Sequence, residues 1–117
     1  MHPRVLVLED DASTLHAWGR TAEALGIETL LCSTAEEALA ALDAGGITAV
    51  VSDFQLATGT SLPVILAARR LDPPLPVVAV TGNPELALSE CRSHGVDVPV
   101  LQKGVRMIDV LTSLVAK

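Results

Sequence analysis

Side chains with carboxylate, hydroxyl and ammonium groups stand directly after four short apolar runs of this sequence. Carboxylates gathered at one place repel each other by about 4 kcal/mol per pair near 4 Å at an effective dielectric near 20, so such a group needs a cation or must shift its pKa values. Oxygen ligands favour a hard ion such as Mg²⁺. A lysine and a hydroxyl suit a phosphoryl group, whose charge spreads over three oxygens. These residues are Glu9, Asp10 and Asp11 after the first run, Asp53 after the third, Thr81 after the fourth and Lys103 after the fifth.

Each of these residues also has a purely structural interpretation. The acids at 9–11 could be solvated loop residues that cap a helix, and Asp53 could be a turn residue at a strand end. Thr81 could cap a helix, and Lys103 could be an ordinary surface lysine. The site is absent only if all these interpretations hold at four separate strand ends, so we favour a site.

The apolar runs that must position these residues alternate with helical patterns five times. Several runs are nearly continuous, as expected for strands of a parallel sheet that is covered on both faces. Pro99 lies in the last run and favours an edge strand there. The runs are Val5–Leu8, Thr29–Leu31, Ala49–Val51, Val77–Val80 and Val98–Leu101.

Helix signals fill the segments between the runs. Thr34 and Glu37 form a capping-box pattern, and Asn83 with Pro84 indicates the start of a later helix. Right-handed crossovers then give an α/β fold, a three-layer sandwich around a five-stranded parallel sheet. Ligands of such sheets bind at the carboxyl ends of the strands.

Composition limits the remaining possibilities. With 117 residues, half of them hydrophobic, residues 1–117 are expected to form a single domain with an aliphatic core. A net charge of -6 and scattered basic residues argue against nucleic-acid binding. No apolar stretch reaches the ~18 residues of a membrane span, so we expect a cytoplasmic protein without membrane contact. Cys32 and Cys91 are expected to be buried thiols.

The ordered motifs resemble the receiver domain of two-component response regulators over the whole chain. Val5–Asp11 is similar to the family's first strand and acidic pair, with Glu9 and Asp10 in register with that pair. Val50–Leu56 is similar to the segment that carries the phosphorylated aspartate. Val80–Gly82 and Leu101–Gly104 resemble the segments of the switch hydroxyl and the lysine.

The resemblance implies a flavodoxin-like doubly wound fold and a role for each matched residue. Asp53 would accept a phosphoryl group from a histidine kinase or a histidine phosphotransfer domain. Thr81 and Lys103 would contact the phosphoryl oxygens. Mg²⁺ would be held by Glu9, Asp10, Asp53 and the backbone carbonyl of Gln55. The domain would be a signalling phosphoacceptor and not an enzyme, with a responding face over residues 84–116 for an output domain or partner.

Four positions depart from the family pattern. Ala57 stands where a proline is usual, and we expect a looser loop there. Ser61 replaces a common glycine, and Val100 replaces the aromatic switch residue. Gly104 follows Lys103 where a cis proline is common, which leaves the geometry of that peptide open, since a cis bond before a non-proline residue costs about 2.5–4 kcal/mol. The lysine segment resembles receivers of hybrid histidine kinases.

Two other classes of function stay open at this point. Ala57 and Gly104 motivate a degenerate receiver that binds partners independently of phosphorylation. An enzyme on a related fold, such as an aspartyl-phosphate phosphatase or a flavin-binding protein, lacks support, because the first loop has neither a DxD motif nor a phosphate loop rich in Ser, Thr and Gly.

Overall fold

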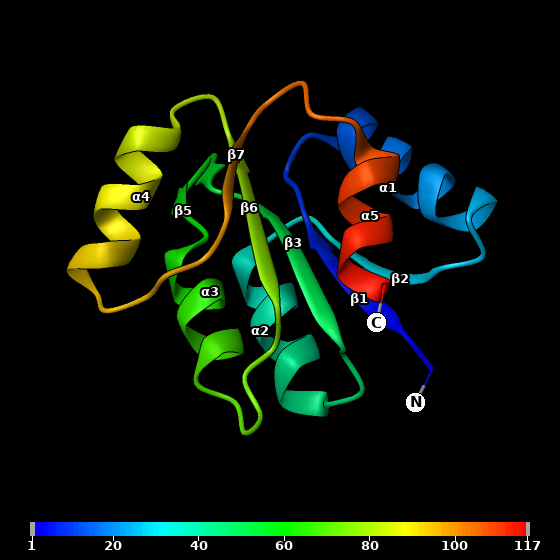
Figure 1. Cartoon of the computed structure of the whole chain (residues 1–117), viewed down its shortest axis with the longest axis horizontal. Helices are drawn as coiled ribbons and strands as arrows, with labels where there is room; N and C mark the ends of the chain where they lie inside the picture. The colour runs from blue at the N-terminus through cyan, green and yellow to red at the C-terminus, as the bar shows by residue number, and fades with distance from the viewer. Residues whose placement is uncertain (1, 117) are drawn as a thin grey trace.

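The computed structural model describes residues 2–116 and contains a five-stranded parallel sheet at its centre (Figure 1). The strand order is β2–β1–β3–β6–β7, which is the flavodoxin-like order when the strands of this sheet are numbered along the chain. The predicted fold class is therefore confirmed. The strands are β1 Arg4–Leu8, β2 Glu28–Cys32, β3 Ala49–Asp53, β6 Val77–Thr81 and β7 Val100–Gln102.

Helices cover both faces of the sheet, as its apolar strands require. Side chains alternate along β1, so Val5 and Val7 pack toward one face while Leu6 and Leu8 pack toward the other. The first face is covered by α1 (Ala12–Ala24) and α5 (Met107–Val115), which lie together in Figure 1. The second face is covered by α2 (Ala35–Ala44), α3 (Leu62–Arg69) and α4 (Pro84–Ser93).

The predicted helix starts are confirmed by their hydrogen bonds. The Thr34 hydroxyl accepts the Glu37 N–H at 3.1 Å, and the Glu37 carboxylate accepts the Thr34 N–H at 3.2 Å, which completes the capping box of α2. Bonds from Ser33 and Thr34 lower the pKa of Glu37. At α4, the Asn83 side chain accepts the Leu86 N–H. These caps fix where the chain leaves the sheet.

Two local features differ from the sequence prediction. The strand β7 is an edge strand, as predicted, but it begins at Val100 and not at Val98, because Pro99 has no N–H and contributes only its carbonyl, to Ala79. A small antiparallel hairpin was not predicted: β4 (Gln55–Leu56) pairs with β5 (Gly59–Thr60) directly after β3. This hairpin shapes the loop that follows Asp53.

The two cysteines and the single tryptophan lie in the interior of the protein. Cys32 and Cys91 are both buried and free, as predicted, and burial raises the pKa of each thiol. Trp18 is 4% exposed in the core between α1 and the sheet. Within residues 2–116, none of the helices has both the length and the apolar character needed to span a bilayer. The outer bounds of the predicted single domain, residues 1 and 117, lie outside the described residues.

Candidate functional site

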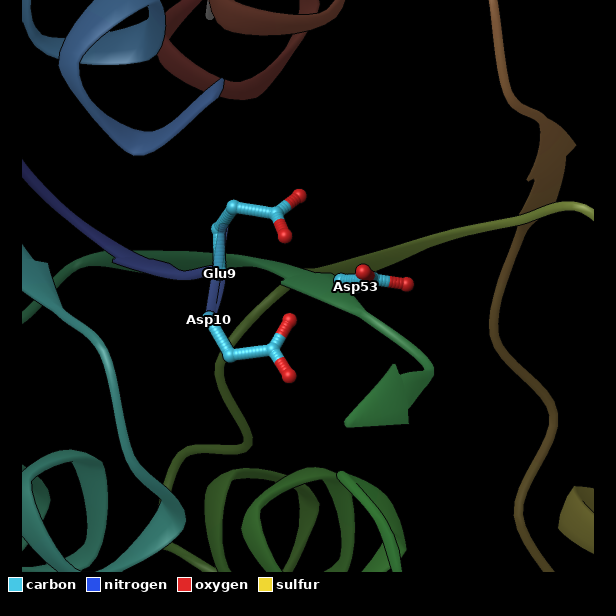
Figure 2. A group of neighbouring side chains, drawn as sticks. All are labelled: Glu9, Asp10 and Asp53. Atoms are coloured by element: carbon cyan, nitrogen blue, oxygen red, sulfur yellow. The ribbon is translucent and has the colours of Figure 1, made fainter. Parts of the chain in front are cut away.

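Three carboxylates meet at the carboxyl end of the sheet. Glu9 and Asp10 follow β1, and Asp53 is the last residue of β3, the strand paired with β1. One oxygen from each of the three side chains lies within 4.8 Å of the others. Figure 2 shows the carboxylates of Glu9 and Asp10 turned toward Asp53. The structure thus brings together the three acidic side chains that the sequence predicted as metal ligands.

Glu9 is the most strongly perturbed member of this cluster. It is 4% exposed, and its Oε2 accepts the N–H of Asp11 at 3.1 Å. Burial raises the pKa of Glu9 to about 7, and the nearby charge of Asp53 acts in the same direction, while the bond from Asp11 opposes the shift. The cluster therefore concentrates negative charge where water solvates it poorly, and a cation would relieve this cost.

Asp11 does not belong to the cluster, because it caps α1. Its Oδ2 accepts the N–H of Thr14 at 2.9 Å and the Thr14 hydroxyl at 2.6 Å. These bonds from Thr14 lower the pKa of Asp11. Of the two interpretations of the acids at 9–11, the cap therefore holds for Asp11, whereas Glu9 and Asp10 join the cluster.

Lys103 approaches Asp53 from the loop after β7. Its Nζ lies 3.2 Å from Asp53 Oδ2, and its backbone N–H donates to the Thr81 carbonyl at 2.8 Å. Partial burial would by itself lower the pKa of Lys103, but the bond to Asp53 and the charges of Asp53, Glu9 and Asp10 outweigh it and raise the pKa. The ammonium is thus held in its charged form beside the carboxylate.

Thr81 ends β6, between the strands that carry Asp53 and Lys103. In the sheet register Asp53 pairs with Val80, so Thr81 lies one position further toward the site. Its side chain is fully buried, and its hydroxyl accepts the Asn83 N–H at 3.1 Å. Within residues 2–116, no hydrogen bond joins Thr81 to Asp53. The structure places Thr81 at the same edge of the sheet as the cluster.

Two backbone hydrogen bonds connect the loop after Asp53 to the acidic cluster. The Gln55 N–H donates to Asp53 Oδ1 at 3.2 Å, and the Ala57 N–H donates to Asp10 Oδ2 at 2.5 Å. The β4–β5 pairing and these two bonds join the loop to the rest of the site, and the expectation of a looser loop at Ala57 stays a prediction. Sequence reasoning missed the contact with Asp10, although the one available signal was that alanine, unlike proline, has an N–H to donate.

The peptide between Lys103 and Gly104 is trans, since Asp72–Pro73 is the one cis bond among the described residues. Gly104 has φ +100, in the region that glycine adopts without a steric penalty. A cavity of about 220 Å³ adjoins this loop and the cluster, and its lining includes Glu9, Asp53 and Trp18. The single tryptophan of the chain therefore lies beside the acids.

Comparisons with known proteins agree with this geometry. No family model matches the sequence. The C4-dicarboxylate transport transcriptional regulatory protein DctD of Rhizobium meliloti (strain 1021) is 31% identical over 87 residues. The match covers 74% of this chain and 19% of DctD, so the chain spans less than a fifth of that curated relative.

Solved structures match nearly the whole chain. A response regulator receiver protein from Sinorhizobium medicae WSM419 has a TM-score of 0.82 at 27% identity, covering 97% of this chain and 91% of that one. The response regulator TrrA of Thermotoga maritima, in complex with Mg(2+)-BeF, has a TM-score of 0.78 and covers 95% of each chain, and at 19% identity it shows a shared fold. The chain belongs to the response regulator receiver domains.

Proposed function

We propose that Asp53 of this receiver domain accepts a phosphoryl group in a reaction that depends on Mg²⁺. The observation that carries the proposal is the arrangement around Asp53. Its carboxylate lies in a cluster whose three acidic oxygens are within 4.8 Å of one another, and the Lys103 ammonium lies 3.2 Å from its Oδ2. A nucleophilic carboxylate next to a cation site and a fixed positive charge is suited to phosphoryl transfer.

The donor set fits Mg²⁺. All its side-chain ligands are carboxylate oxygens, and Mg²⁺ prefers oxygen ligands while keeping several waters. Glu9, Asp10 and Asp53 would hold the ion together with the backbone carbonyl of Gln55, which belongs to the hairpin bonded to two of these acids. When bound, Mg²⁺ supplies neutralisation of the charge on the phosphoryl oxygens.

The chain's own residues account for the transfer step. A carboxylate oxygen of Asp53 attacks phosphorus, an O–P bond forms, and the P–N bond of a phosphohistidine breaks with its electron pair passing to the imidazole nitrogen. Lys103 stabilises the charge on the phosphoryl oxygens, and Thr81 donates its hydroxyl hydrogen to one of them. Gly82, next to Thr81, has no side chain to obstruct the approach of the group.

The partners follow from this chemistry. We propose a histidine kinase or a histidine phosphotransfer domain as the donor, and residues 84–116 as the face that meets an output domain or partner. Two residues of the site are connected to this face. The Thr81 hydroxyl accepts the N–H of Asn83, which caps α4, and Lys103 directly follows β7. The net charge of -6 argues against nucleic-acid binding by the domain itself.

Intact-protein mass spectrometry after treatment with acetyl phosphate tests the proposal. The expected result is one phosphoryl adduct with Mg²⁺, little or none with EDTA, and none in the Asp53→Asn variant. Asp43→Asn, an exposed acid near the end of α2, is the matched control and should label like the original chain. Undiminished labelling of Asp53→Asn would contradict the assignment. No adduct with either acetyl phosphate or a phosphohistidine donor would favour a receiver that only binds partners.

A further inference from the structure

The hairpin after Asp53 connects two acids that come from different strands. We call residues 55–60 the acid-bridging hairpin. Its Gln55 N–H donates to Asp53 Oδ1, and its Ala57 N–H donates to Asp10 Oδ2. Asp10 follows β1, so the second bond joins the hairpin to a separate segment of the chain. The backbone of one short element therefore contacts two of the three carboxylates.

Asp10 depends on this hairpin more than the other acids do. Glu9 is buried and accepts the Asp11 N–H, and Asp53 is buried, accepts the Gln55 N–H and pairs with Lys103. Asp10 is the least buried of the three, and within residues 2–116 the Ala57 N–H is the one hydrogen-bond donor to its carboxylate. Without that donor, its side chain would be free to rotate into solvent.

The bond leaves Asp10 able to bind a cation. A carboxylate has two oxygens and about four acceptor positions, and the Ala57 N–H occupies one of them. The other oxygen stays available while the orientation of the side chain is fixed. Fixing a ligand in advance removes part of the entropy cost of binding.

We propose that the Ala57 N–H is a positioning group for a divalent cation at the acidic cluster, acting through Asp10. The inference rests on the proposed function and adds a coupling to it. If the bond between Ala57 and Asp10 favours the cation, the cation must favour that bond by the same factor. Cation binding therefore tightens the acid-bridging hairpin, which also carries the Gln55 carbonyl.

Replacement of Ala57 by proline removes this N–H. Ala57 starts the two-residue turn between β4 and β5, so its N–H is not part of the pairing between them. Ala57 does not have a positive φ, and the preceding Leu56 is in a strand, as a residue before proline prefers. Ala57→Ser keeps the N–H at the same exposed position and is the matched control.

The first test is Mg²⁺ affinity, measured by Trp18 fluorescence and by calorimetry on the full chain. We expect Ala57→Pro to weaken the Kd about tenfold, equivalent to one hydrogen bond of ~1.4 kcal/mol, and Ala57→Ser to change it little. An unchanged Kd in a folded Ala57→Pro variant would overturn the positioning role and leave the proposed function intact. Absence of Mg²⁺ binding by the original chain would overturn both.

The second test needs no proline variant. Hydrogen exchange followed by NMR should show the Ala57 amide protected in the original chain, further protected by Mg²⁺, and exposed in Asp10→Ala. Equal exchange in the original chain and in Asp10→Ala would contradict the bond, and exchange unaffected by saturating Mg²⁺ would contradict the coupling.

Discussion

The Nζ of Lys103 lies 3.2 Å from Oδ2 of Asp53, although Asp53 ends β3, Lys103 follows β7, and β6 lies between these two strands in the sheet. The intervening strand holds Lys103 beside the site, because the Thr81 carbonyl accepts the Lys103 N–H at 2.8 Å. The ion pair thus depends on the register of three neighbouring strands.

Removal of the Lys103 charge should slow phosphorylation. We expect Lys103→Met to reduce the rate with acetyl phosphate about tenfold, because one charge-assisted contact to the phosphoryl oxygens is lost. The rate is measured by intact mass against time. Arg106→Met is the control, since Arg106 is exposed and its described ion partner is Asp109, outside the cluster. Equal rates for Lys103→Met and the original chain would remove Lys103 from the site.

The raised pKa of Glu9 predicts a pH-dependent stability in EDTA. The pKa is about 7 in the folded chain and has an ordinary value of 4.5, so the folded state holds the proton more tightly between these values. The contribution of Glu9 to the free energy of unfolding should therefore be complete below the lower value, decrease as pH rises toward 7, and level off above it. Urea unfolding at several pH values measures this dependence.

Glu9→Gln, Glu36→Gln and added Mg²⁺ test whether Glu9 causes this pH dependence. Glu9→Gln should flatten the decrease, whereas Glu36→Gln, at an exposed position of α2, should leave it in place. Mg²⁺ should stabilise the protein more at about pH 8 than at about pH 5.5, because its ligands must be deprotonated. A slope in Glu9→Gln equal to that of the original chain would show that another group is responsible.

Much of the site was predictable because strand ends are predictable. Apolar runs as clear as Val5–Leu8 locate the carboxyl ends of the strands, and a parallel sheet must bring those ends to one edge. The role of each acid was less clear. Asp10 and Asp11 are adjacent and identical in type, and only the backbone geometry makes one face the cluster and the other cap α1.

The acid-bridging hairpin could not be predicted for a different reason. Its strands have two residues each, too short for any alternating pattern, and Gly59 and Ala57 signal only a turn. The hairpin forms because tertiary contacts fix it, including the bond from Ala57 to Asp10 across the site. The expectation for this loop rested on the missing proline, and nothing in the sequence shows that the Ala57 N–H donates to Asp10.

Replacement of Ser61 should stabilise the protein, whereas most substitutions destabilise it. Its hydroxyl is fully buried, has no hydrogen-bond partner within the described residues, and does not cap α3. Ser61→Ala should therefore raise the free energy of unfolding by about 1 kcal/mol, since a buried hydroxyl without a partner is costly. Urea unfolding provides the measurement.

The matched comparison for Ser61 is Thr34→Ala. The Thr34 hydroxyl caps α2, so its removal should lower the free energy of unfolding by about 1 kcal/mol. Destabilisation of similar size in both variants would show that Ser61 makes a contact that offsets its burial.

Phosphorylation should be transmitted to α4 through Asn83. The Thr81 hydroxyl accepts the Asn83 N–H, so turning it toward a phosphoryl group on Asp53 weakens that bond at the start of α4. We expect amide chemical shifts of Asn83 and of residues 84–116 to change on addition of Mg²⁺ with beryllofluoride, and to stay constant in Asp53→Asn. Unchanged shifts across this face would contradict the proposed output surface.

Location of the phosphoryl group on the chain tests the central claim most directly. The chain is treated with acetyl phosphate and Mg²⁺, the aspartyl phosphate is reduced with borohydride to homoserine, and tandem mass spectrometry finds the modified residue. The predicted result is modification at Asp53 alone, and none when EDTA replaces Mg²⁺. Modification at Glu9, Asp10 or an acid outside the cluster, with Asp53 unchanged, would contradict the account.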